Sequence, residues 1–200
     1  GNDLDQFRDR NGKQVLNRNS PDFKDSGAIM VGAASARVPH KRSYFSNYGS
    51  RVDVYGWGNA VDTTDAKPSE FTTNLYTSSF SGTSSASPII AGAAASIQGI
   101  AKHNKEKVYT PSQLRDILSD PSTGTKSNDP VSDKIGVLPD LKAILSKLGF
   151  SPNLSNDSSI VFPDEPEINK GNKGNEGSTI TFPKEDSANS EGDSTFIFPE

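Results

Sequence analysis

Residues 80–95 read Phe-Ser-Gly-Thr-Ser-Ser-Ala-Ser-Pro-Ile-Ile-Ala-Gly-Ala-Ala-Ala, and this stretch is the most informative part of the chain. Gly82 and Thr83 predict a turn ahead of Ser84, and the small apolar residues that follow predict a helix from Ser84 to about Ile100 that is buried on most sides. The first turn of a helix presents unpaired backbone N–H groups and a partial positive charge. Because such groups stabilise an oxyanion, Ser84 is a candidate nucleophile whose own N–H is an oxyanion donor.

The residues ahead of this helix predict strands. Residues 28–34 form a short apolar run bounded by glycine, and residues 52–55 form a second short run, so both predict buried strands. Residues 56–79 have a loop-like composition, in which we expect an edge strand or a hairpin.

The residues behind this helix predict two more helices. Residues 110–113 read Thr-Pro-Ser-Gln, which is typical of a capped helix start. The apolar spacing from Leu141 to Leu148 predicts a last helix, which Gly149 ends. Strands with intervening and following helices indicate a layered α/β fold.

The last quarter of the chain differs in composition from the rest. Residues 151–200 carry ten acidic and three basic side chains, a net charge of −7, whereas residues 1–150 carry a net charge of +3. Asn, Ser, Gly, Glu and Asp dominate residues 151–200, and such a composition favours disorder. We therefore expect a folded domain over residues 1–150 and a disordered acidic tail over residues 151–200.

The tail repeats one five-residue word three times, as Ser159-Ile160-Val161-Phe162-Pro163, Thr179-Ile180-Thr181-Phe182-Pro183 and Thr195-Phe196-Ile197-Phe198-Pro199. Each word has the residue types to add a short strand to the sheet edge of a protein partner. A linker duplicated by replication slippage accounts for the words equally well. Both interpretations of the tail stay open.

Composition argues against several classes of site and partner. The chain has no cysteine, which excludes disulfides and thiolate metal sites, and its two histidines argue against a histidine-based metal site. No stretch approaches the roughly 20 apolar residues of a membrane span. The cationic stretch from Arg37 to Arg42 would be the footprint of a nucleic acid, but the acidic net charge and the lack of a groove-reading motif argue against that partner.

The residues around Ser84 resemble the Gly-Thr-Ser-x-Ala-x-Pro signature of the subtilisin-like serine proteases, or subtilases. Segments 26–33, 45–49 and 53–58 follow the order of the second half of a subtilase domain. The resemblance covers residues 1–150 and none of the tail. It implies a three-layer α/β/α domain with a mostly parallel sheet, present here as its C-terminal part, and peptide hydrolysis through an acyl-enzyme.

The resemblance also implies roles for individual residues. Ser84 would be the nucleophile, Gly82 and Thr83 would contact the substrate, and Asn2 would be a second oxyanion donor, although Asp3 follows it where the family usually has glycine. The implied substrates are polypeptides, and the implied location is extracellular or at the cell surface. The chemistry needs no cofactor, and the family often binds structural calcium, for which no ligands can be named.

The acid and base of a catalytic triad are hard to find in these residues. Residues 25–27 spell the Asp-Ser-Gly of the family's acid motif, but Asp25 opens a strand where the family's aspartate ends one. His40 lies among cations rather than in a His-Gly motif, and His103 is most simply a solvated residue. We therefore expect the triad acid and base upstream of Gly1, and this chain alone to be inactive.

A second function stays open, namely an inactive subtilase-like scaffold or binding module that presents the repeat tail. The upstream coding sequence separates the two functions, because an active parent needs a strand ending in Asp-[Ser/Thr]-Gly and a His-Gly motif.

Overall fold

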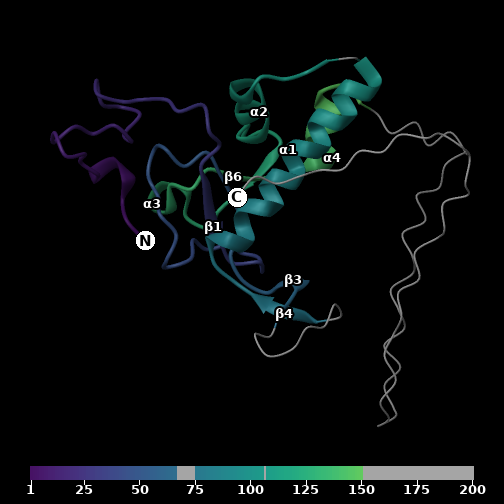
Figure 1. Cartoon of the computed structure of the whole chain (residues 1–200), viewed down its shortest axis with the longest axis horizontal. Helices are drawn as coiled ribbons and strands as arrows, with labels where there is room; N and C mark the ends of the chain where they lie inside the picture. Colours follow the sequence, from purple (N-terminus) through teal and green to yellow (C-terminus); the bar gives the residue numbers. More distant parts are fainter. Residues whose placement is uncertain (67–74, 106, 151–200) are drawn as a thin grey trace, which may run out of the picture. The chain divides into compact units, whose positions relative to one another are not determined.

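A four-stranded sheet with the order β1-β2-β6-β5 organises the computed structural model, which describes residues 1–66, 75–105 and 107–150 (Figure 1). β1 (Val31–Ala34), β2 (Val54–Trp57) and β6 (Val137–Pro139) run parallel, and β5 (Gly124–Lys126) pairs antiparallel with β6. The predicted α/β class with a mostly parallel sheet is therefore confirmed. The predicted tail lies outside the described residues.

The two apolar runs form neighbouring strands, as predicted, but the strands are shorter or shifted. β1 covers only the end of the run 28–34, and β2 begins two residues later than predicted. Side chains take part in the contacts at this end: the Met30 N–H donates to the Asp53 carboxylate (2.7 Å) and the Ala28 carbonyl accepts from Arg51 (2.7 Å), while the Met30 carbonyl still accepts from the Asp53 N–H (2.9 Å).

The predicted hairpin is a separate two-stranded antiparallel sheet. It consists of β3 (Val61–Thr64) and β4 (Tyr76–Phe80), with an irregular register at the start of β3. β4 leads directly into the turn that precedes the long helix.

Residues at the ends of the helices explain where each helix begins or stops. α1 (Thr83–Lys105) continues past the predicted end, and the cations in its last turn complement the helix dipole. α2 (Pro111–Leu118) has the predicted capping box, and α4 (Leu141–Lys147) is followed by a glycine with a φ of +75°. The short η1 (Leu4–Gln6) and α3 (Pro130–Asp133) complete the described elements.

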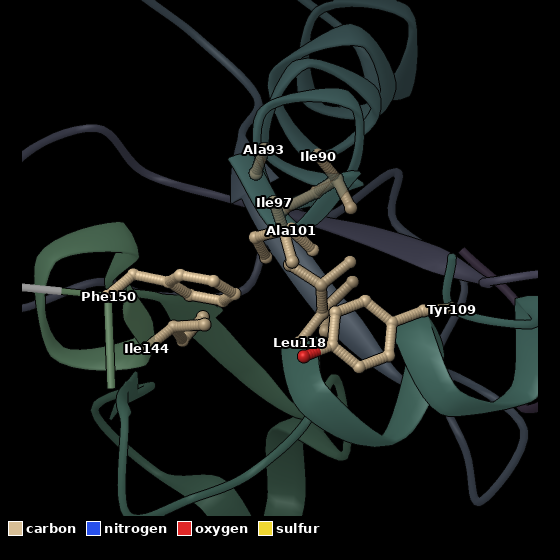
Figure 2. Packing of buried hydrophobic residues seen from close by; sticks show 9 residues of the cluster. Ile90, Ala93, Ile97, Ala101, Tyr109, Leu118, Ile144 and Phe150 are labelled. Carbon is tan, nitrogen blue, oxygen red and sulfur yellow. The ribbon is translucent and has the colours of Figure 1, made fainter. Parts of the chain in front are cut away.

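Apolar side chains pack on both faces of the sheet. Val54 faces α1, whose buried residues meet α2, α4 and the residues that flank them; Figure 2 shows this cluster of Ile90, Ala93, Ile97, Ala101, Tyr109, Leu118, Ile144 and Phe150. Tyr55, next along β2, points to the opposite face and packs with Leu4 of η1, Ala34 and Ile135. Within the described part of the chain, no helix is long and apolar enough to cross a membrane.

Candidate active site

A tight turn between β4 and α1 holds the predicted nucleophile. Gly82 has a φ of +111°, a conformation that favours glycine, and its N–H donates to the Gly58 carbonyl (2.9 Å). The buried Ser85 hydroxyl contacts the carbonyls of Gly82 (2.8 Å) and Trp57 (2.9 Å). The turn is therefore tied to the end of β2 from two sides.

The first turn of α1 lies directly on β2. A Cβ on Gly56 would lie 2.6 Å from the Ala86 carbonyl oxygen, so only glycine allows this approach without a shift. Small residues are needed near Ser84 because Gly56 and Ala86 let the backbone of β2 and the backbone of α1 touch.

Ser84 lies in this first turn and is exposed. Within residues 1–66, 75–105 and 107–150, neither its hydroxyl nor its backbone N–H has a hydrogen-bond partner. An exposed hydroxyl beside a free N–H at the positive end of a helix suits acyl transfer, in which the N–H stabilises the developing oxyanion.

Asn2 is held by a different part of the fold. Its backbone N–H donates to the Asn47 side chain (2.9 Å), and its carbonyl accepts from the Tyr48 N–H (3.1 Å). Asn47 lines a mainly apolar hollow of about 660 Å³ along α1, and Thr83 lines the same hollow. Asn2 makes no contact with Ser84 among the described hydrogen bonds, so its role as an oxyanion donor stays a prediction.

Asp25 and His40 are bound to other groups of the fold, and His103 lies at the opposite end of α1 from Ser84. Both carboxylate oxygens of Asp25 accept from Arg115 (2.7 Å each), and this hydrogen-bonded guanidinium holds the pKa of Asp25 well below its usual range. Nδ1 of the buried His40 lies 2.7 Å from the Ser35 carbonyl oxygen. His103 is exposed in the last turn of α1.

The sequence matches the Subtilase family over residues 1–157. The chain belongs to the subtilase family. Subtilisin-like protease 7 of Arthroderma gypseum is 38% identical over 100 residues, which cover 49% of this subtilase chain and 23% of the relative.

A solved structure, that of the patellamide maturation protease PatA, is similar with a TM-score of 0.47 and 22% identity, over 62% of this subtilase chain and 44% of that chain. The subtilase chain therefore spans less than a quarter of the curated relative and less than half of PatA.

A buried ionic network at the start of β2 was not predicted from the sequence. Asp53 accepts from Arg51 (2.7 Å), from Arg18 and from the Met30 N–H (2.7 Å), and Arg51 is almost fully buried. The network fastens residues 28–30 of this subtilase to β2. The signal in the sequence is a single aspartate between the buried valines Val52 and Val54, because a buried charge needs a partner.

Side chains that bind metal ions do not gather at one place in the described part of this subtilase chain. In residues 1–66, 75–105 and 107–150 no group of three His, Cys, Asp or Glu side chains is arranged to hold a metal ion. The structural calcium that the family resemblance implies stays a prediction.

Proposed function

We propose that this subtilase chain carries the nucleophile of a serine endopeptidase, and that this nucleophile is Ser84. Membership of the family supports serine-type peptidase activity at the level of the family. The assignment rests on the position of Ser84 in the first turn of α1. There its hydroxyl is exposed and lies beside a backbone N–H that has no hydrogen-bond partner among the described residues.

The proposed reaction is acyl transfer to Ser84. The serine oxygen forms a bond to the carbonyl carbon of a peptide, and its proton passes to a histidine and then to the leaving amine. Negative charge develops on the carbonyl oxygen, which the Ser84 N–H and the Asn2 amide would stabilise. Removing one such donor typically lowers the rate by about 10²–10³. Water then hydrolyses the acyl-enzyme.

The histidine and aspartate of the reaction are proposed to come from polypeptide outside the described residues. His40 is held against the Ser35 carbonyl, and Asp25 is paired with Arg115, so neither group is available to activate Ser84. Burial raises the pKa of Tyr55 to about 12, so this phenol does not replace the base near neutral pH. The chain alone is therefore expected not to turn over a peptide substrate.

Acetylation by N-acetylimidazole in imidazole buffer tests the nucleophile, because free imidazole takes the place of the missing base. We expect Ser84 to be acetylated about tenfold faster than the exposed Ser87, since one oxyanion donor acts without a positioned base. Peptide mapping by mass spectrometry measures both rates. Ser84→Ala removes the fast site, and the matched Ser87→Ala variant keeps it.

Equal acetylation of Ser84 and Ser87 would contradict the proposal and favour the alternative of an inactive scaffold that presents the tail. The remaining proposals rest on the family alone: polypeptide substrates, an extracellular or cell-surface location, and structural calcium with no assigned ligands. Docking of the tail words to a protein partner is likewise a proposal.

A further inference from the structure

A loop with exposed cations connects β1 to the turn that precedes β2. Residues 35–42, here called the cationic loop, expose Arg37, Val38 and Lys41. In the described part of the chain neither Arg37 nor Lys41 forms an ion pair. Arg42, by contrast, is paired with Asp133 (3.7 Å). Among the residues that the structure describes, no carboxylate is paired with these two cations.

Hydrogen bonds within the cationic loop fix its shape. The Ser35 hydroxyl donates to the Arg37 carbonyl (3.1 Å) and accepts from the Lys41 N–H (2.9 Å), and the Ser35 N–H donates to the Lys41 carbonyl (2.8 Å). The buried His40 turns inward, and its carbonyl accepts from the Asn128 N–H (2.7 Å). Because the backbone is already ordered, the two cations bind a ligand with little loss of chain entropy.

The cationic loop begins beside the nucleophile turn. Gly58 bridges the two, because its N–H donates to the Ala34 carbonyl (2.8 Å) and its carbonyl accepts from the Gly82 N–H (2.9 Å). The Ala36 N–H adds a bond to the Asn59 side chain (2.9 Å). Two such backbone steps span about 10 Å. Figure 1 shows that β1, which leads into the loop, lies next to the start of α1.

We propose that Arg37 and Lys41 bind carboxylates of the polypeptide that Ser84 attacks, and so favour acidic substrates. An extended chain advances about 3.4 Å per residue, so the roughly 10 Å between the start of the cationic loop and the nucleophile turn corresponds to about three residues of a bound peptide. The proposal rests on the proposed function, because it takes the bound peptide to be the substrate.

An acidic peptide fits these two cations better than a nucleic acid does. The guanidinium of Arg37 is able to hold one carboxylate through two parallel hydrogen bonds. Affinity for DNA comes mainly from neutralising several phosphates with lysine and arginine, and two exposed cations supply few such contacts.

Fluorescence anisotropy with the full chain tests the proposal at low ionic strength, where the screening length is about 10–30 Å. The probes are a labelled glutamate-rich peptide, its glutamine counterpart and an oligonucleotide of equal charge. One variant combines Arg37→Glu with Lys41→Glu. The matched control combines Lys102→Glu with Lys142→Glu, two exposed lysines on α1 and α4 that give the same change of net charge.

We expect the loop variant to bind the glutamate-rich peptide about tenfold more weakly, and the control variant to bind within about twofold of the wild type. The glutamine peptide should bind weakly to all three proteins. Equal loss in both variants, no loss in the loop variant, or tighter binding of the oligonucleotide would each overturn the proposal.

The experiments test the role of Ser84 and the role of Arg37 and Lys41 independently of each other. Ser84→Ala should bind the glutamate-rich peptide as the wild type does, because that assay needs no reaction at Ser84. Selective acetylation of Ser84 with unchanged peptide binding in the loop variant contradicts only the role of Arg37 and Lys41. Specific peptide binding without selective acetylation contradicts only the nucleophile.

Discussion

Asp53→Ala is expected to lower the free energy of unfolding by about 3–5 kcal/mol, because it leaves a buried guanidinium without its carboxylate. The side chains of Arg51 and Asp53 are only 2% and 3% exposed, so water does not replace the lost partner. The same substitution removes the acceptors of the Arg18 Nη2 group and of the Met30 N–H, while the Arg18 Nε group keeps the Ser50 carbonyl. Urea unfolding of the full chain, followed by circular dichroism, measures the change.

The matched control for Asp53→Ala is Asp22→Ala. Asp22 lies 3.7 Å from Lys13, and both side chains are well exposed, so this variant should lose less than about 1 kcal/mol. Asp53→Asn keeps the shape of the side chain and gives a measurable transition if the alanine variant does not fold. An Asp53→Asn variant no less stable than Asp22→Ala would show that the buried pair adds little to stability.

Gly56→Ala is expected to destabilise the chain by about 1–3 kcal/mol through overpacking. The new Cβ would lie 2.6 Å from the Ala86 carbonyl oxygen and 3.0 Å from its Cα, so helix and strand must separate. Because this contact seats the first turn of α1, the preference for acetylation of Ser84 over Ser87 should fall as well. Urea unfolding and peptide mapping measure the two effects on one sample.

Gly99→Ala is the control within the same helix. A Cβ at Gly99 meets nothing within 4 Å, and alanine favours a helix by up to about 1 kcal/mol over glycine. This variant should keep or gain stability and keep the preference for Ser84. A Gly56→Ala variant with the stability and selectivity of the wild type would contradict the close packing of α1 on β2.

The three longer helices, α1, α2 and α4, were predictable because their signals are local, whereas the short η1 and α3 were not predicted. Thr110 and Gln113 cap α2 through contacts three residues apart, and Gly149 adopts the positive φ that ends α4. The turn and the helix start around Ser84 were predictable for the same reason, since one short stretch contains both. The sequence signals of these elements lie within a few residues, although Trp57 and Gly58 hold the turn before α1 in place.

The short strands and the charged contacts were not predictable because they depend on distant partners. β5 and β6 have three residues each, too few for an alternating pattern, and they exist through pairing with each other and with β2. Arg115 meets Asp25 across 90 positions of sequence. The sequence placed His40 among cations and gave no sign of its burial, whereas its contact with the Ser35 carbonyl makes it the buried support of the cationic loop.

Labelling of the wild-type chain by a fluorophosphonate probe, without imidazole, tests whether a base that activates Ser84 lies within this chain. We propose that Ser84 is the nucleophile and that its base lies outside the described residues. We predict that intact-mass spectrometry shows no more label on the wild type than on Ser84→Ala. Efficient labelling that maps to Ser84 would contradict the account, because it would require a base within this chain.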